Sequence, residues 1–448
     1  MNRHRIILML IVTAAIVGGS YGWSLINRAH DAPAPASITV GLENPAPAPG
    51  MKTTDELITF WRGRFERDPR DFISLTFLGD AFIRKARETG DVSEYERADA
   101  TLRKALELHP NYEVAQAYLS SVQYTKHDFQ SALDLASRVY AAHPGAIQSL
   151  ATIGDAQLEL GNYTEAEAAY QKLLEKNPSP PVYSRLARLA WLQGRPEEAL
   201  NSMRRAADES LAVDRAGENV AWYQFQLAEL YFNTGQIEEA AKRYTAALDS
   251  FNNYYLALAG LGKARAAEGR YDEAISLYER AAAIVPQPDF LAALGDLYAL
   301  TGHPDKAQRQ YDTVEFIGKL AAINKVIYNR QLALFYANHD LKPAEALDLA
   351  RKELTVRKDI YGYDALGWAL YKNGRYQEAA TAIEQAMKLG TRDSMLYYHA
   401  GMIYKDSGDQ QRARTMLTGA LSINPHFSPL YAPRAQQALA ELGVAASK

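Results

Sequence analysis

The sequence predicts an all-α solenoid, built from about ten copies of one helical hairpin. A short phrase that begins with glycine returns seven times, at intervals of 33, 34 or 41 residues apart from one interval of 72. The copies begin at Gly161, Gly194, Gly235, Gly269, Gly302, Gly374 and Gly408. Asp340 takes the place of glycine in a further copy inside the longest interval. A period near 34 residues is typical of stacked repeats that bury their apolar faces against one another.

The copy at residues 150–178 shows how the phrase folds. Apolar residues recur at helical spacing up to Gly161, where glycine can enter the left-handed conformation that ends a helix. A second apolar stripe follows and ends at Pro178. Gly154 and Ala166 are small where the two antiparallel helices are expected to cross. A larger side chain at either position would force the helices apart.

This pattern resembles the tetratricopeptide repeat (TPR), and the resemblance covers nearly everything after residue 68. The family's small residue in the first helix matches Gly79, Gly154, Ala187, Ala228, Gly262, Gly295, Gly367 and Gly401. Its alanine at the start of the second helix matches Ala98, Ala132, Ala166, Ala199, Ala240, Ala274, Ala307, Ala346, Ala379 and Ala413. The resemblance implies a right-handed α-solenoid. Its ten repeats are expected at about 72–110, 113–144, 147–178, 180–212, 221–252, 255–286, 288–320, 326–358, 360–392 and 394–425.

Three insertions interrupt the regular spacing. Seven extra residues lie in the first hairpin and seven more between Ala199 and Ala240. Seven residues make about two helical turns, so that a helix can lengthen without rotating its buried face. We therefore expect the first hairpin and residues 208–219 to protrude. A smaller insertion at 315–325 reads as continued helix.

The chain outside the repeats divides into segments of different composition. Residues 51–69 and 426–448 are expected to form capping helices at the two ends of the solenoid, which spans 70–425. Residues 31–50 are rich in proline and alanine and predict a disordered linker, because they cannot pack a core. Residues 1–30 predict a membrane anchor.

The anchor prediction depends on residues 6–26, which are 21 consecutive uncharged positions against the ~20 that span a bilayer as helix. Arg3 and Arg5 precede them and favour a cytoplasmic amino terminus. The sequence therefore predicts a single-pass protein of the cytoplasmic (inner) membrane, with its repeats on the periplasmic or extracytoplasmic side. The alternative is a secreted protein whose signal peptide is cleaved near Gly18 and Ser20. We favour the anchor because the uncharged stretch is longer than a usual signal core.

Composition argues against several kinds of chemistry. The net charge of -4 is spread along the chain, which does not favour nucleic acid as a partner. The absence of cysteine excludes disulfides, zinc ribbons and thiol catalysis. The nine histidines form no metal-binding motif, and we expect no metal and no cofactor. Paired acids such as Glu197 and Glu198 begin second helices, where the helix dipole explains them without catalysis. We expect no catalytic residue and no enzyme.

Partner binding is expected on the concave face, which the resemblance implies is lined by the first helix of each hairpin. The predicted partner-binding residues are Arg188, Trp191, Trp222, Phe225, Phe232, Tyr361, Trp368, Tyr371 and Tyr398. Aromatic residues and arginine often dominate protein interfaces, and a groove lined with them suits a peptide. The alternative is that several of these rings pack against the neighbouring repeat. The lysines and asparagines with which some relatives hold a carboxylate are replaced here by Asp80, Asp155, Glu229 and Asp296.

Together these features predict a membrane-tethered TPR scaffold that binds a protein or peptide partner through its concave groove and catalyses nothing. One alternative is a regulatory or carrier subunit of an envelope biosynthesis or secretion complex. A second is a cryptic enzyme, which no residue pattern favours.

Overall fold

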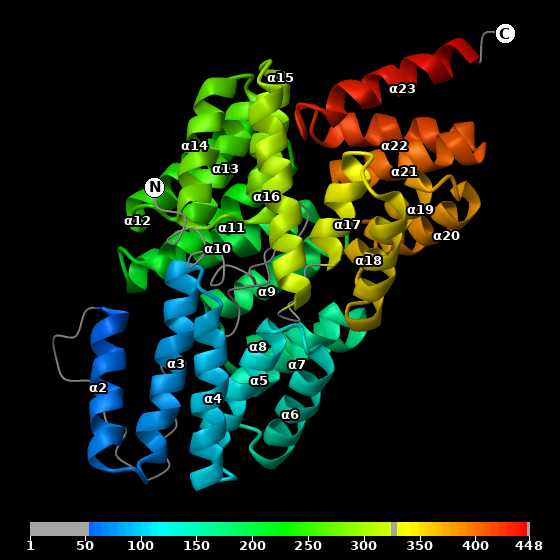
Figure 1. The fold of residues 1–448 in the computed structure, drawn as a ribbon. Coiled ribbons are helices and arrows are strands. Elements are labelled where there is room, and N and C mark those ends of the chain that lie inside the picture. Colours follow the sequence, from blue (N-terminus) through cyan, green and yellow to red (C-terminus); the bar gives the residue numbers. More distant parts are fainter. Residues whose placement is uncertain (1–52, 324–328, 446–448) are drawn as a thin grey trace. The chain divides into compact units, whose positions relative to one another are not determined.

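The computed structural model describes residues 53–323 and 329–445, over which the chain forms 22 helices and no strand (Figure 1). The predicted membrane segment at 6–26 and the linker at 31–50 lie outside the described residues. Within the described part of the chain, no helix combines the length and the apolar character needed to cross a bilayer.

Twenty of the helices form ten consecutive hairpins, at the places that the repeat pattern predicts. The hairpins are α3 (Phe72–Thr89) with α4 (Ser93–Leu108), α5 (Glu113–Thr125) with α6 (Phe129–Ala142), α7 (Ile147–Glu159) with α8 (Tyr163–Lys176), α9 (Pro180–Leu192) with α10 (Pro196–Val213), α11 (Glu218–Asn233) with α12 (Ile237–Ser250), α13 (Tyr255–Ala267) with α14 (Tyr271–Ile284), α15 (Pro288–Leu300) with α16 (Pro304–Ile323), α17 (Asn329–Asn338) with α18 (Pro343–Val356), α19 (Ile360–Lys372) with α20 (Tyr376–Met387), and α21 (Ser394–Ser407) with α22 (Gln410–Ile423). Helix α2 (Thr54–Arg67) precedes them and α23 (Tyr431–Ala445) follows.

The helices pack mainly on their neighbours in sequence. Consecutive helices are in contact along α2–α8, along α10–α16 and along α17–α23. First helices also contact the first helix of the next hairpin, as α5 does with α7 and α19 with α21. This arrangement is that of an α-solenoid, in which each repeat is stabilised by its neighbours.

The described chain divides into two compact units, of which the first ends at Val182 and the second begins at Tyr183. The division falls within α9, the first helix of the fourth hairpin. The sequence predicted one array over 70–425, and these domain limits stay a prediction.

In the third hairpin the small residue lies where the sequence places the helix crossing. A Cβ atom at Gly154 would lie 2.5 Å from Cε1 of Tyr170, on the second helix of the same hairpin. The Tyr170 hydroxyl donates to Asp155 at 2.7 Å, next to that glycine. The same bond joins Tyr311 to Asp296 at 2.8 Å, and Tyr244 to Glu229. Three of the acids that replace the family's carboxylate-holding residues therefore bond tyrosines of their own hairpins.

The turns confirm the role of the repeated glycine. All seven glycines that open the phrase have positive φ, between 69° and 96°. Asp340 adopts φ 55° where it replaces glycine, and His127, in the turn between α5 and α6, adopts φ 62°. The turn thus keeps its left-handed residue even where the side chain opposes that conformation.

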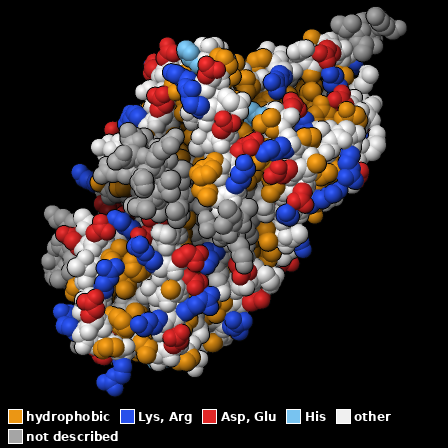
Figure 2. All heavy atoms as spheres, in the orientation of Figure 1, with side chains coloured by type: hydrophobic (Ala, Val, Ile, Leu, Met, Phe, Trp, Pro, Cys, Tyr) orange, Lys and Arg blue, Asp and Glu red, His pale blue; other side chains and the backbone are white. Residues whose placement is uncertain are grey.

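The insertions lengthen helices, as the sequence indicates. Helices α3 and α10 each have 18 residues, and α16 has 20 and continues to Ile323. At the end of α10, Val213 is 83% exposed. The face of the molecule in Figure 2 carries lysine, arginine and acidic side chains side by side, without a stripe of one sign.

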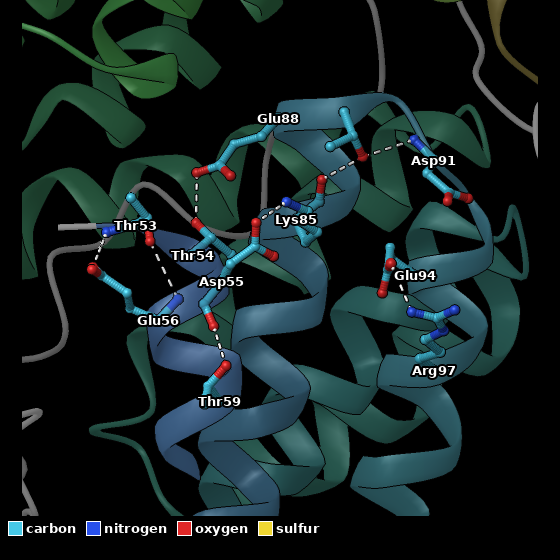
Figure 3. A network of polar contacts seen from close by, with 11 residues as sticks. Thr53, Thr54, Asp55, Glu56, Thr59, Lys85, Glu88, Asp91, Glu94 and Arg97 are labelled. Atoms are coloured by element: carbon cyan, nitrogen blue, oxygen red, sulfur yellow. Dashed lines mark hydrogen bonds and ion pairs between the residues drawn. The ribbon is translucent and has the colours of Figure 1, made fainter. Parts of the chain in front are cut away.

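Helix α2 is fixed to the first hairpin by polar contacts (Figure 3). Thr53 and Glu56 form a capping box at its start. The Thr54 hydroxyl donates to Glu88 of α3 at 2.6 Å. The apolar face of α2 packs on α3 through Trp61, whose ring stacks on Phe77 at 5.1 Å. These contacts suit the capping role predicted for residues 51–69.

Candidate binding site in the second unit

All nine predicted partner-binding residues belong to the second unit, and eight of them are buried. Arg188, Trp191, Trp222, Phe225, Phe232, Tyr361, Trp368 and Tyr398 are at most 7% exposed. Tyr371 is half-buried. The expectation that these side chains face an open groove is therefore not met, and packing inside the protein describes them better. Their role in partner binding stays a prediction.

Three of the predicted aromatic residues, Trp368, Tyr371 and Tyr398, meet in one cluster, in which Trp368 and Tyr371 are stacked. The Trp368 ring lies between Tyr371, at 4.8 Å, and His399, at 4.2 Å, and is nearly parallel to both. The Tyr398 ring is 5.9 Å from Trp368, and burial raises the pKa of Tyr398 to about 12. The Trp368 indole donates to the amide oxygen of Asn338 at 2.8 Å. Aromatic stacking with a satisfied indole makes this cluster a rigid part of the fold.

A hydrogen bond joins two of the predicted residues that are far apart in sequence. The Trp191 indole donates to the Tyr361 hydroxyl at 3.2 Å, although 170 positions separate the two residues. Burial raises the pKa of Tyr361 well above its ordinary value, and the nearby Asp393 charge adds to the shift. Phe225 packs on Tyr244 and Tyr254 of its own and the next hairpin. The predicted residues are therefore brought together in pairs and stacks inside the second unit.

This meeting is possible because the turns of the fourth and fifth hairpins touch the ends of the ninth and tenth. The Thr391 hydroxyl donates to the carbonyl of Leu192. The Asn424 amide donates to the carbonyl of Phe232 at 2.8 Å. At Gly194, a Cβ atom would lie 2.2 Å from the carbonyl oxygen of Gly390. The repeats of the second unit therefore curve until they close on themselves.

The closure surrounds a cavity of about 180 Å³. Its wall comes from α11, α13, α14, α15, α17 and the start of α21, together with the loop at residues 424–431 that joins α22 to α23. In that loop the Tyr431 hydroxyl donates to the carbonyl of Asn338 at 3.2 Å. A concave pocket with a mixed lining is the usual form of a ligand site.

Cationic side chains on the wall are paired with carboxylates. Lys263 contacts Glu229 at 2.7 Å and Arg330 contacts Asp359 at 3.0 Å. Nε2 of His339 lies 2.8 Å from Asp296. Burial alone would lower the pKa of His339, but the bond to Asp296, the charge of Asp296 and the carbonyl of Phe335 together raise it above the ordinary value. No group of three or more histidines and acids in the described ranges could hold a metal ion.

Asp289 differs from the other acids on the wall. Asp296 bonds His339 and Tyr311, and Asp393 accepts the backbone N–H groups of Met395 and Leu396. Asp289 is partly buried, and its carboxylate forms no hydrogen bond or ion pair within the described residues. Burial raises the pKa of Asp289 to about 6, and the charge of Arg330 opposes this shift. A carboxylate with a strongly shifted pKa on a cavity wall marks a candidate site.

Of the nine predicted partner-binding residues, Phe232 alone lines the described cavity, and the other cavity residues were not among those predicted from the sequence. Asp289 lies in the first turn of α15, where the helix dipole favours any acid. Gln331, Asn338 and His339 follow no motif. The cavity forms because α15, α17 and the loop at 424–431 come together, and the repeat pattern does not predict that contact.

Comparisons with known proteins agree with the repeat pattern. Models described as tetratricopeptide repeat match residues 152–211, 225–287, 265–318, 360–392 and 396–427. A TPR repeat-containing protein of Methanocaldococcus jannaschii is 22% identical, over 57% of this chain and 52% of that protein. The chain thus spans about half the length of this curated relative.

Three solved structures are similar along most of their length. The Cut9–Hcn1 heterotetramer of APC/C matches with 16% identity and a TM-score of 0.33, over 87% of this chain and 93% of that one. Yeast Tom70 matches with 14% identity and a TM-score of 0.35, over 88% and 92%. MamA matches with 23% identity and a TM-score of 0.31, over 38% and 96%. The matches of the repeat models, together with the ten hairpins, confirm that the chain carries tetratricopeptide repeats.

Proposed function

We propose that this protein is a non-catalytic scaffold that binds a protein or peptide partner through the inner face of its repeats. The observation that carries the proposal is the series of ten hairpins, in which successive first helices contact each other from α3 to α7 in the first unit and, in the second unit, from α11 to α13 and from α15 to α21. Such repeats present a continuous series of side chains to a partner, and tetratricopeptide repeats are in general interaction modules.

In the second unit, we place the partner contact at the accessible edge of the aromatic stack. Tyr371 is half-buried, and its hydroxyl donates to Asp406 at 2.7 Å. The Tyr376 ring lies 5.7 Å from Tyr371 and is 38% exposed. The other predicted rings help to hold the unit closed, so Tyr371 and Tyr376 are the part of the cluster that a partner can reach.

The test begins with crosslinked capture from the native cell, followed by binding of the purified partner to the purified full chain. We expect Tyr371→Ser to weaken binding at least about tenfold, as loss of an aromatic anchor usually does. Tyr140→Ser is the matched control, because Tyr140 is a half-buried tyrosine on α6 in the first unit. If both variants lost affinity for the partner equally, or if neither lost any, Tyr371 would not be part of the partner contact. If no captured protein bound directly to the purified full chain, the proposal that the protein is a scaffold would be wrong.

Tyr371 is a better position for this test than Trp222 or Trp368. Both tryptophans are at most 2% exposed, and alanine there would leave a large cavity. Such a change costs about 3 to 5 kcal/mol and would confuse loss of binding with loss of folding.

We also propose that residues 6–26 tether the repeats to the cytoplasmic membrane on its export side. Support comes from the sequence: 21 uncharged positions follow two arginines. The linker at 31–50 could hold the repeats up to ~60 Å from the bilayer. Removing residues 1–30 should release the protein from the membrane fraction. Protease added outside the cytoplasmic membrane should digest the repeats. An intact, salt-extractable protein lacking its first residues would instead indicate a cleaved signal.

A further inference from the structure

His339 directly follows α17, and both nitrogens of its ring face hydrogen-bond acceptors. Nδ1 lies 2.7 Å from the carbonyl oxygen of Phe335, one turn earlier in the chain, and Nε2 lies 2.8 Å from the carboxylate of Asp296 on α15. A neutral imidazole carries a hydrogen on one nitrogen and accepts at the other. Two contacts of this length with acceptors need a hydrogen on each nitrogen, so the geometry is that of a charged ring.

The surroundings of this ring favour its charge on balance. Burial lowers the pKa of His339, and the charge of Arg434 on α23 acts in the same direction. The bond to Asp296 and the charge of Asp296 raise the pKa by more, so that it lies above the ordinary 6.5. The end of a helix also favours a cation. Tyr311 on α16 and Tyr431 on α23 stay neutral, because burial and the charge of Asp296 raise the pKa of both hydroxyls.

The pair of His339 and Asp296 joins the seventh hairpin to the eighth, where α15 contacts α17. Tyr311 of α16 completes the contact. Its hydroxyl donates to the same oxygen of Asp296 at 2.8 Å, and its ring lies 4.7 Å from the ring of His339. The residue before His339 is Asn338, whose amide oxygen accepts the Trp368 indole at 2.8 Å. The end of α17 therefore connects α15 and α16 to the aromatic cluster around Trp368.

We propose that His339 is a pH-sensitive clamp between α15 and α17, which is closed when the ring is charged and loosened when the ring is neutral. The neutral ring loses its charge attraction to Asp296, and one of its nitrogens then faces an acceptor without a hydrogen. The stabilisation is fully present below about pH 6.5 and is lost as the pH rises through the higher pKa of the folded protein. This clamp does not depend on the proposed partner contact at Tyr371.

The first test follows the titration of His339 by NMR in the full chain, labelled with ¹³C at histidine. The signal that disappears in His339→Gln identifies this residue among the nine histidines. We expect its pKa to lie above 6.5. Asp296→Asn should lower that pKa, because the charge is removed while the amide oxygen can still accept from Tyr311. A pKa at or below 6.5, or one that Asp296→Asn leaves unchanged, would overturn the proposal.

The second test measures local opening of α15 and α17 by hydrogen exchange at pH 7 and pH 9, corrected for the intrinsic exchange rate. Asp289 and Asp393 contribute little in this range, because the pKa of each is about 6. In the wild type the equilibrium constant for opening should rise with pH, by about threefold if the pKa of His339 is one unit above 6.5.

Variants assign this rise to the ring. His339→Gln keeps an N–H donor but carries no charge, so its opening constant should be the same at both pH values. His303→Gln removes an exposed histidine in the turn between α15 and α16 and should respond to pH as the wild type does. If the wild type showed no rise, or if His339→Gln showed the same rise, the clamp would not exist.

Discussion

At the scale of single residues, the ionised carboxylate of Asp289 destabilises the folded protein. Its pKa rises from an ordinary 3.8 to about 6 because burial disfavours the charged form. The folded protein therefore holds this proton more tightly than the unfolded chain does. The stabilisation from the proton is complete below about pH 4 and is lost as the pH rises through about 6. The pKa of Asp393 is raised to about 6, chiefly by burial, and acts in the same direction.

Asp289→Asn should therefore stabilise the second unit at pH 7, by about 3 kcal/mol at most, and flatten its pH dependence between pH 4 and 6. Denaturant unfolding of both proteins across this range measures the effect, with Asp305→Asn as the control for an exposed acid. A less stable Asp289→Asn protein at pH 7 would show that the carboxylate has a stabilising partner.

The small residue of the repeat allows a second test between two glycines at the same repeat position. A Cβ at Gly401 would lie 2.5 Å from Cγ of Leu417, which is fully buried. At Gly367 the nearest atom would be 3.4 Å away, an ordinary contact. Gly401→Ala should destabilise the protein by about 1 to 3 kcal/mol. Gly367→Ala should be neutral or stabilise by up to about 1 kcal/mol, because alanine favours helix. Thermal unfolding of the two variants decides, and equal effects would contradict the crowding argument.

At the scale of elements, the contact between distant turns is the feature that closes the second unit. Gly194 and Gly374 occupy the same place in their hairpins, with φ of 69° and 71°. Around Gly374 a Cβ would meet nothing within 4 Å, whereas at Gly194 it would strike the Gly390 carbonyl. Gly374→Ala should cost about 1 to 2 kcal/mol, from backbone strain alone. Gly194→Ala should pay the same backbone strain and lose about 1 to 3 kcal/mol in addition, because its Cβ would collide with the Gly390 carbonyl. Urea unfolding measures both, and equal costs would show that the turn contact contributes little.

The hairpins themselves could be predicted because their signals are local. The glycine at the turn and the small residue at the crossing each act within one repeat. So does the acid that accepts a hydrogen bond from a tyrosine, as Asp155 does from Tyr170. Register alone puts Asp340 in the glycine's role, and Asp340 has positive φ. The existence of ten hairpins follows from signals of this kind.

The candidate site could not be predicted in the same way. Whether Trp191 meets Tyr361 depends on the rotation between successive repeats, added over five of them. A small change in each rotation would leave an open groove instead of a closed one. The sequence pattern fixes which residues face inward but not how tightly the inward faces curve. Eight of the nine predicted residues are accordingly buried, and the cavity beside Asp289 carries no motif.

At the scale of the whole molecule, the two units should differ in cooperativity. In the first unit, bonds between repeats join neighbours, as when Tyr124 donates to Glu159 at 3.2 Å. In the second unit, bonds such as Asn424 to Phe232 join repeats that are far apart in sequence. Nearest-neighbour contacts allow repeats to open one at a time, whereas a closed set of contacts requires them to open together.

Native-state hydrogen exchange, read by mass spectrometry, should therefore give one common opening free energy to α11–α12 and α19–α22. The first unit should show a graded series of lower values. In Gly194→Ala the protection of α11–α12 and of α19–α22 should fall together, since the turn contact couples them. Gly374→Ala, which strains a turn outside that contact, should lower protection mainly around α19 and α20. If Gly194→Ala weakened the fourth and fifth hairpins and left the ninth and tenth unchanged, the second unit would behave as an ordinary open solenoid, and the cavity would lack the closure that shapes it.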